Sequence, residues 1–243
     1  MTATRTELPD LSPSQELAVL ARSLFMHGYD DHNLGHISYR HADDTLIVTP
    51  FEIGWDEVRA SDMVHLDLGG NVLDGCRSVT PAISLHLALH RARPDINVGI
   101  HNHSRWGTVW AAIGRVPPAY DQMSSAIREN HIGFFDEYVG AVNDMASAEM
   151  NVEALADNDM TFLGNHGVFV VGRSIQLAHH RAISLEHRCR LAWQVQVAGG
   201  GRPMPERFAR DLAELNEVRG TGIPHMYTYM VRKVLRLDPL VLE

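Results

Sequence analysis

Ile96 to Ala112 read INVGIHNHSRWGTVWAA, and this stretch decides how the 243-residue chain is interpreted. Its apolar run ends in a His-Asn-His sequence, and a second apolar run, at 160–163, is soon followed by His166. Side chains two residues apart on a strand point the same way, so His101 and His103 can bind one ion. His166, at the end of a nearby strand, can supply a third imidazole. Three neutral histidines with an open coordination position are typical of a catalytic metal site rather than a structural one.

The pair His101 and His103 is weak evidence when taken alone. With 15 histidines in 243 residues, about one His-x-His pair is expected by chance. The alternative is two structural histidines at a strand end, one buried and hydrogen-bonded and the other solvated. The choice therefore depends on the rest of the chain.

Composition restricts the class of protein. The net charge of −9 argues against nonspecific nucleic-acid binding, which needs a basic surface. Cys76 and Cys189 are too few for a disulfide framework or a thiolate metal site. The first residues lack the apolar core of a signal peptide, and no apolar stretch reaches membrane-spanning length. We expect a soluble cytoplasmic protein without membrane or nucleic-acid partners, and, because no linker is visible, a single domain over residues 1–243.

Hydrophobic spacing and turn residues predict an irregular alternation of helices and strands. Ser12 and Pro13 are typical of a helix start, and the helix is expected to run to about His27. Strands are predicted at 36–40 and 45–49, a hairpin at 63–73, and helices at 81–91, 106–113, 144–157, 175–197, 205–218 and 224–236. Hairpin signals between the helices favour a mixed sheet over a regular parallel repeat. The predicted fold class is therefore α/β, with three α/β/α layers.

Several segments, in the same order, resemble motifs of the class II aldolase/adducin family. They are Gly35-His36-Ile37-Ser38-Tyr39-Arg40, Leu46-Ile47-Val48-Thr49-Pro50, Arg93-Pro94-Asp95 with His101-Asn102-His103, and Asn165-His166-Gly167. The resemblance runs from about residue 15 to 200. It implies a largely antiparallel central sheet and a tetramer with active sites at subunit contacts. It also implies a divalent metal, Zn²⁺ first and Mn²⁺ or Fe²⁺ as alternatives, bound by His101, His103 and His166.

The chain departs from the family's sugar-phosphate aldolases at two places. Their Ser-Ser-Glu triplet, which carries the acidic catalytic residue, corresponds to Thr80-Pro81-Ala82 here. Their Thr-Pro-Ser-Gly phosphate loop corresponds to Thr49-Pro50-Phe51-Glu52. A carboxylate facing a phosphate dianion is repulsive, so Glu52 argues against a phosphorylated substrate. An aldolase or epimerase needs a tuned base, and Ala82 cannot be one.

Decarboxylation fits these changes because departing CO₂ leaves its electron pair behind. It requires a Lewis acid to stabilise a developing enolate or phenolate, and later a proton donor. The candidates for the donor are Glu52, His32, His36 and Tyr120. The candidates for binding a flat ring and its carboxylate are Phe51, Trp55, Trp106 and Arg105, although Trp106 and Trp110 can equally be core residues. We therefore predict a metal-dependent carbon–carbon lyase that decarboxylates a non-phosphorylated hydroxy-aromatic or related small-molecule acid.

Three alternatives keep the same fold. The protein can be an aldolase on a small hydroxy-carbonyl compound with relocated acid–base groups. Three imidazoles with free positions can also hold Fe²⁺ in an oxygenase, and an adducin-like scaffold would have no catalysis. Other histidines are assigned structural roles: His86 and His90, four apart on one helix face, have no third ligand nearby in the sequence.

Overall fold

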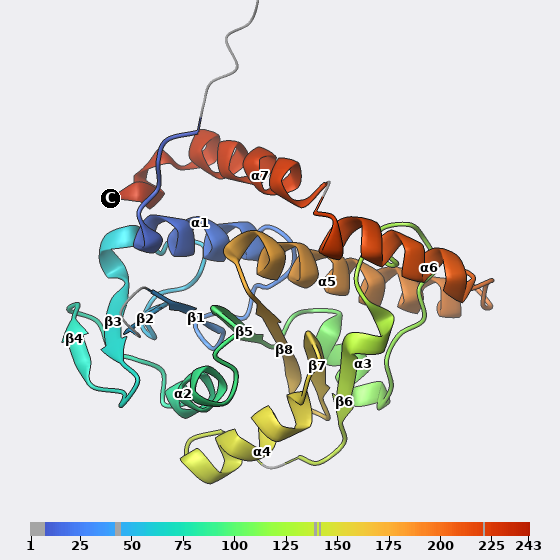
Figure 1. Ribbon diagram of the computed structural model, residues 1–243, viewed down its shortest axis with the longest axis horizontal. Coiled ribbons are helices and arrows are strands. Elements are labelled where there is room, and N and C mark those ends of the chain that lie inside the picture. Colours follow the sequence, from blue (N-terminus) through green and yellow to red (C-terminus); the bar gives the residue numbers. More distant parts are fainter. Residues whose placement is uncertain (1–7, 42–44, 139, 141, 221) are drawn as a thin grey trace, which may run out of the picture.

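An eight-stranded sheet forms the centre of the computed structural model, which describes residues 8–41, 45–138, 140, 142–220 and 222–243 (Figure 1). The strand order is β4-β3-β2-β1-β5-β8-β7-β6. Neighbouring strands are antiparallel except β6 and β7, which are parallel, so the expected mixed, largely antiparallel sheet is confirmed. The strands are β1 (His36–Arg40), β2 (Thr45–Val48), β3 (Val64–Asp67), β4 (Val72–Asp74), β5 (Val98–Asn102), β6 (Ile132–Phe135), β7 (Met160–Leu163) and β8 (Gly167–Gly172).

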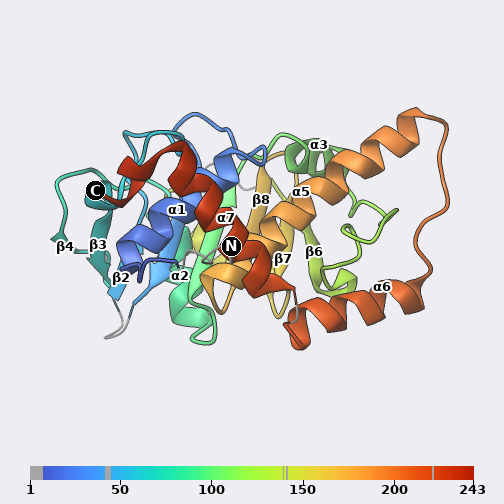
Figure 2. The same cartoon turned by 90° about the horizontal axis from the view of Figure 1, so that it is seen from above.

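Helices cover both faces of this sheet and give the expected α/β/α layers. The helices are α1 (Pro13–Phe25), α2 (Ile83–Ala92), α3 (Gly107–Ile113), α4 (Met145–Leu155), α5 (Ile175–Val197), α6 (Glu206–Ala213) and α7 (Ile223–Leu237). On one face α1 and α5 lie on the strands and α7 packs over them (Figures 1 and 2). On the other face α2 and α4 pack against each other beneath the sheet. Among the described residues, no helix is both long and apolar enough to span a bilayer.

Local sequence determines where α1, a helix of the first layer, begins. Ser12 Oγ accepts a hydrogen bond from the backbone of Gln15, and the Gln15 side chain accepts one from Ser12 N, a reciprocal capping box. Pro13 occupies the first helical position, as predicted. Leu17, Leu20 and Leu24 then recur on one buried face and join the main core. Residues 1–7, part of the stretch used to argue against a signal peptide, lie outside the described residues.

The register between β1 and β5 prepares the functional site. His36 lies opposite His101, and Ser38 lies opposite Gly99. Because the side-chain period of a strand is two, all four positions share one face. Gly99 is required there, since a Cβ atom would lie 2.6 Å from Leu89 Cδ2 and 3.1 Å from His86 Nδ1. The α2 side chains therefore sit directly on the sheet beside the end of β5.

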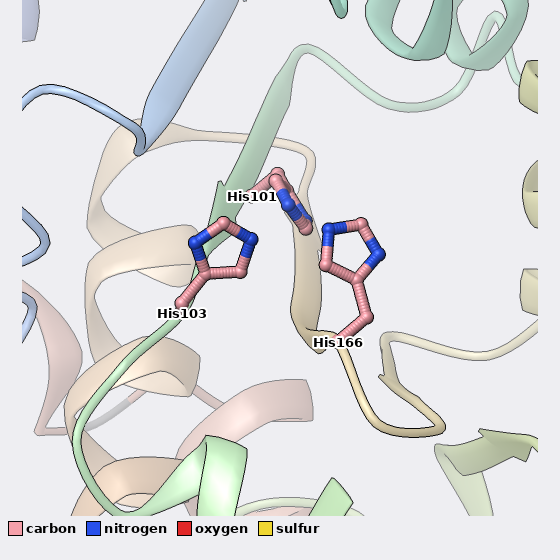
Figure 3. Close-up of side chains that lie close together, drawn as sticks. All are labelled: His101, His103 and His166. Carbon is pink, nitrogen blue, oxygen red and sulfur yellow. The ribbon is translucent and has the colours of Figure 1, made fainter. Parts of the chain in front are cut away.

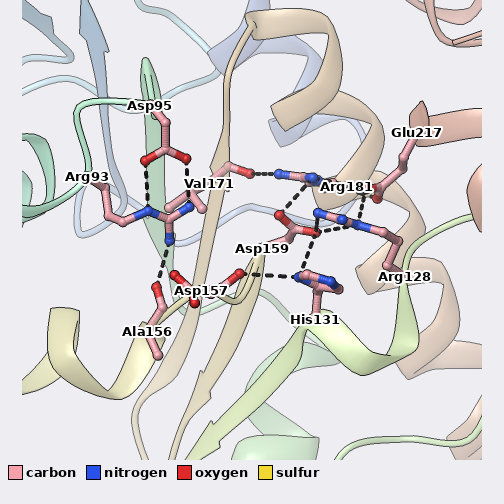
Figure 4. A network of polar contacts seen from close by, with 10 residues as sticks. All are labelled: Arg93, Asp95, Arg128, His131, Ala156, Asp157, Asp159, Val171, Arg181 and Glu217. Atoms are coloured by element: carbon pink, nitrogen blue, oxygen red, sulfur yellow. Dashed lines mark hydrogen bonds and ion pairs between the residues drawn. The ribbon is translucent and has the colours of Figure 1, made fainter. Parts of the chain in front are cut away.

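A buried network of charges ties the C-terminal part of the chain to the sheet edge (Figure 4). Arg181, on α5, contacts Asp159 and Glu217 at 2.8 and 2.9 Å and donates to Val171 O at 2.7 Å. Arg128 Nε donates to Asp159 at 3.0 Å and to Glu217 at 3.2 Å. Glu217 comes from the π-helix Glu214–Val218, inside the helix predicted at 205–218. Two buried carboxylates thus neutralise the buried guanidinium group of Arg181 and that of Arg128, whose side chain is 31% exposed.

Candidate metal centre

His101, His103 and His166 converge at the end of β5, beside the turn that joins β7 and β8 (Figure 3). Each offers one ring nitrogen, and these three atoms lie within 4.8 Å of one another. The ring centroids are 4.8 to 5.1 Å apart in all three pairs. The structure therefore brings together the three imidazoles that the sequence singled out, in a triangle small enough for one ion to contact all three.

Hydrogen bonds to two of the rings leave their Nε2 atoms available to bind a metal. His101 Nδ1 donates to Val168 O at 3.1 Å, because a carbonyl oxygen can only accept. His103 Nδ1 lies 2.8 Å from Asp31 Oδ2, which also accepts the backbone N–H of His103 at 3.1 Å. Outer partners of this kind fix the tautomer and orientation of metal-binding histidines. Asp31 was missed by the sequence analysis, because it lies 72 positions from His103 and its neighbour Asp30 is also acidic.

The turn that carries His166 depends on the residues flanking it. Asn165 has φ of +54°, a left-handed conformation that asparagine tolerates better than most residues. A Cβ atom on Gly167 would lie 2.6 Å from Asn102 O and 2.9 Å from His103 Cδ2. The Asn-His-Gly sequence thus allows β8 to approach the end of β5 and holds His166 beside the other two rings.

The electrostatics of the three-histidine cluster suit a cation. Burial lowers the pKa of His101 well below its usual range, and neighbouring imidazoles lower it further. Burial is also the main cause that lowers the pKa of His166 to about 4. Both rings are therefore neutral at pH 7, which is the form that binds metals. Three convergent ring nitrogens, two of them on rings anchored by outer partners, fit a divalent ion of the Zn²⁺ type.

A cavity of about 200 Å³ opens beside the three-histidine cluster. His36 and Phe51, both predicted to be site residues, line it, and so does Ala82 at the start of α2. No acidic side chain is among its described lining residues, which are Leu34, His36, Phe51, Thr80, Pro81, Ala82, Leu85, His101, His103, Val142, Asn143 and His166. The cavity is thus mostly apolar, with imidazoles at one end.

The remaining predicted site residues lie away from this cavity within the described chain. Glu52 is exposed and its carboxylate accepts hydrogen bonds from Ser78 N at 2.8 Å and from the Ser78 hydroxyl. These bonds lower the pKa of Glu52, the hydroxyl contributing most. The side chain is therefore engaged by the segment between β4 and α2, and a catalytic role for Glu52 stays a prediction.

The predicted ring- and carboxylate-binding residues have other surroundings. Trp106 packs against Trp193, with ring centroids 5.1 Å apart, and Arg105 is exposed. Trp55 is buried in the main core, and Tyr120 packs against the same core from its edge. One chain alone therefore does not bring these side chains to the cavity, and their roles in substrate binding or proton donation stay predictions.

Glu186 accepts hydrogen bonds from the segment that follows β5. Its two oxygens accept from Ser104 Oγ, Trp106 N and Gly107 N at 2.8 to 3.0 Å. These bonds fix the loop between β5 and α3, directly after His103. Burial raises the pKa of Glu186 to about 7 against these donors. No local pattern indicates this role, because Glu186 comes from α5, 80 positions from Trp106.

Residues 15–193 match the family described as Class II Aldolase and Adducin N-terminal domain, so this chain belongs to the class II aldolase/adducin family. The resemblance inferred from the motifs is therefore confirmed. The fold agrees: the chain is similar to L-fuculose 1-phosphate aldolase from Glaciozyma antarctica PI12, with a TM-score of 0.82, 21% identity, and coverage of 98% of this chain and 97% of that one.

Two relatives fall in the branch of the family that acts on aromatic acids. The 3,4-dihydroxyphthalate decarboxylase of Arthrobacter keyseri is 31% identical over 234 residues, which cover 91% of this chain and 93% of the relative. The 4-hydroxy-3-prenylphenylpyruvate oxygenase/4-hydroxy-3-prenylbenzoate synthase of Streptomyces roseochromogenus subsp. oscitans is 29% identical, covering 79% of this chain and 71% of the relative. Similarity to these relatives supports the prediction that this protein is an enzyme.

Proposed function

We propose that this protein is a metal-dependent carbon–carbon lyase that decarboxylates a non-phosphorylated hydroxy-aromatic carboxylic acid. His101, His103 and His166 would hold the ion, Zn²⁺ first and Mn²⁺ or Fe²⁺ as alternatives. We further propose that residues 1–243 form one domain, and that the protein works in the cytoplasm as a homo-oligomer, most simply a tetramer. The similarity to 3,4-dihydroxyphthalate decarboxylase over nearly the whole chain supports the reaction class.

The observation that carries the proposal is the position of Ala82. Its methyl group lines the cavity beside the three histidines, where sugar-phosphate aldolases of the family carry a catalytic glutamate. A reaction that removes a proton from carbon needs a base at such a place. Loss of CO₂ does not, because the bond that breaks leaves its electrons on the substrate. The absence of an acidic side chain among the described lining residues therefore favours decarboxylation.

The cavity walls fit a flat, apolar ring. Phe51, Leu34, Leu85 and Val142 line one part of the cavity, and the imidazoles line another. A ring held against the apolar walls would direct its oxygen substituents to the imidazoles. A bound divalent ion would supply Lewis-acid stabilisation of negative charge on a substrate oxygen. The apolar walls lower the effective dielectric constant beside the imidazoles, which strengthens electrostatic interactions there.

The loop after β2 argues against a phosphorylated substrate. The carboxylate of Glu52 accepts the Ser78 amide and hydroxyl, so these donors are already occupied by an anion of the chain itself. A phosphate at this loop would meet the negative charge of Glu52 and the ring of Phe51. A substrate with a carboxylate and hydroxyl groups, and no phosphate, agrees with this arrangement.

The direct test is a screen of hydroxylated benzoates and phthalates with zinc- or manganese-loaded protein, in which CO₂ release and the ring product are measured together. We expect stoichiometric CO₂ with at least one hydroxylated acid, and none with its phosphorylated derivative. Ala82→Glu should not increase this rate. A marked increase would mean that an acid–base group at position 82 assists the reaction, which would contradict the argument from Ala82.

An iron-dependent oxygenase is the second candidate, and the similarity to the Streptomyces oxygenase/synthase favours it specifically. The same three imidazoles would hold Fe²⁺. In this case oxygen uptake would accompany turnover of an aryl-pyruvate-like acid, and zinc-loaded protein would be inactive. An oxygen electrode therefore separates the two candidates.

A further inference from the structure

A continuous chain of buried polar contacts runs from the cavity into the α2 layer. His36 Nδ1 lies 2.7 Å from His86 Nε2, and His86 Nδ1 lies 2.6 Å from Ser38 Oγ. Ser38 Oγ lies 2.8 Å from His90 Nε2, and His90 Nδ1 lies 3.3 Å from Ile96 O. All four side chains are buried, with exposed fractions of 0 to 4%. We call these four residues the histidine chain.

The far end of the histidine chain fixes the direction of every hydrogen bond in it. Ile96 O is a carbonyl oxygen and can only accept, so His90 Nδ1 carries a proton and His90 Nε2 accepts from the Ser38 hydroxyl. The Ser38 oxygen then accepts from His86 Nδ1–H, and His86 Nε2 accepts from His36 Nδ1–H. His36 is left with an unprotonated Nε2, and His36 lines the cavity. In this arrangement of contacts each ring holds one proton, so only the nitrogen that carries it is at issue.

We infer that His36 Nε2 is a hydrogen-bond acceptor that recognises a hydroxyl group of the substrate, and that the rest of the histidine chain keeps it in that state. This inference rests on the proposed function, because it places the substrate in the cavity beside the three metal-binding histidines. His36 is then a specificity-determining residue, whereas His86, Ser38 and His90 are positioning residues. The substrate class narrows to acids whose ring bears a free hydroxyl at the position that reaches His36.

His36 is well placed for this role. Its ring centroid is 4.9 Å from that of His101, so a substrate oxygen near the metal-binding cluster has a neighbouring substituent within reach of His36. His36 does not belong to the cluster of three convergent ligand nitrogens. An acceptor nitrogen attracts an O–H group and repels a carboxylate or ether oxygen. A ring that lacks the hydroxyl leaves the buried Nε2 unpaired, which disfavours its binding.

The scaffold holds the histidine chain in one arrangement. His36 and Ser38 share a face of β1, and His86 and His90, four apart, share a face of α2. A Cβ atom on Gly99 would lie 3.1 Å from His86 Nδ1 and 3.3 Å from Ser38 Oγ, so the missing side chain makes room for these contacts. Because the positions come from a strand pair and a helix rather than from loops, the direction of the hydrogen bonds is preorganised.

The first test reads the tautomers directly, by NMR of zinc-loaded protein labelled with ¹⁵N-histidine. We expect a proton on Nδ1 and none on Nε2 for His36, His86 and His90. A proton on His36 Nε2 in the unmodified protein would overturn the inference. His90→Phe removes the acceptor of the Ser38 hydroxyl, which can then donate to His86 Nδ1 and reverse the chain. In that variant we expect the proton of His36 to move to Nε2. His179→Phe, which removes another buried histidine, should leave the His36 tautomer unchanged.

The second test measures ligand preference without turnover. Calorimetry on the zinc-loaded protein would compare 2-, 3- and 4-hydroxybenzoate with the matching methoxybenzoates, which keep the oxygen but lose the donor. We expect at least one hydroxy isomer to bind about tenfold or more tightly than its methoxy partner. This preference should fall to about twofold or less in His36→Phe and His90→Phe and persist in His179→Phe.

The outcomes separate this inference from the proposed function. If the hydroxyl preference is the same in His36→Phe as in the unmodified protein, the metal site alone recognises the hydroxyl and the inference is wrong. If the tautomers and the preference are as expected but no CO₂ is released from any acid, the proposed reaction fails while the role of His36 stands. If CO₂ is released but His36 carries its proton on Nε2, the proposed reaction stands and the role of His36 is wrong.

Discussion

Asp31 offers a sharp test of the metal centre, because its contribution can be isolated from that of the ligands. Its Oδ2 atom accepts from His103 Nδ1 at 2.8 Å and from His103 N at 3.1 Å, and only 12% of the Asp31 side chain is exposed. In Asp31→Asn the amide oxygen can still accept both hydrogen bonds, but the negative charge behind the imidazole is lost. Outer-partner substitutions of this kind typically cost about 10- to 100-fold in metal affinity, which is about 1.4–2.7 kcal/mol.

The assay is competition for Zn²⁺ against a chromophoric chelator at pH 7, with circular dichroism to confirm that the variant is folded. Asp30→Asn is the matched control, because Asp30 is the adjacent residue, has the same charge and is exposed. It should bind zinc within about twofold of the unmodified protein. If Asp31→Asn also stays within about twofold, or if both variants lose affinity equally, the assignment of Asp31 as the partner of His103 would be refuted.

Three further predictions concern the ligands and the interior. His103→Ala leaves two imidazoles and should abolish stoichiometric zinc binding, measured by elemental analysis after gel filtration; retained metal would contradict the ligand assignment. Burial lowers the pKa of His90 and His179 to about 3, so each binds a proton when the chain unfolds below pH 6.5. The free energy of unfolding of metal-free protein should therefore fall as pH drops from 6.5 to 5, by up to about 1.4 kcal/mol per pH unit for each. Glu186 opposes this trend, because its pKa is raised to about 7 and the folded chain therefore binds this proton more tightly than the unfolded chain. A free energy of unfolding that increases as pH drops from 6.5 to 5 would contradict the prediction that the histidines dominate. Glu186→Gln points an amide N–H₂ at one or more of these donors and should lower stability in urea unfolding by about 1–3 kcal/mol. An unchanged midpoint would count against the role of Glu186 in fixing the loop between β5 and α3.

Much of the fold could be predicted because local patterns were strong. The Ser12 cap, the alternation at 36–40 and the helical spacing at 175–197 all lie in elements of the expected type. Two strands were not predicted. β6 is four residues long and contains a glycine, and its parallel partner β7 lies beyond α4 in the sequence. β8 is an apolar run, buried at every position, that shows no alternation.

In the candidate site, too, the residues with a local sequence pattern could be predicted and those brought together only by the fold could not. The three-histidine cluster could be predicted because His101 and His103 are two residues apart at a strand end and the His166 turn has its own motif. β5 ends at Asn102, so His103 lies just beyond the strand rather than on its face. Asp31 could not, because only the folded chain brings it to His103. Only part of the histidine chain could be predicted. The sequence places His86 and His90 on one helix face, but it did not indicate their partners, and both were assigned structural roles. The partners of these two residues come from the strand register, which no local pattern specifies.

Glu217 has a consequence for how much of the chain must be present for folding. The region that matches the family ends at residue 193, yet Glu217 balances the guanidinium groups of Arg181 and Arg128 inside the molecule. Truncation at the family boundary would leave buried Arg181 and partly exposed Arg128 facing the single carboxylate of Asp159, and loss of the partner of a buried charge such as Arg181 costs about 3–5 kcal/mol. It would also strip α7 from the core, where Val231 and Val234 are buried. We therefore expect the 50 residues after residue 193 to belong to the same cooperative folding unit, and a fusion or domain exchange that uses this protein should retain them.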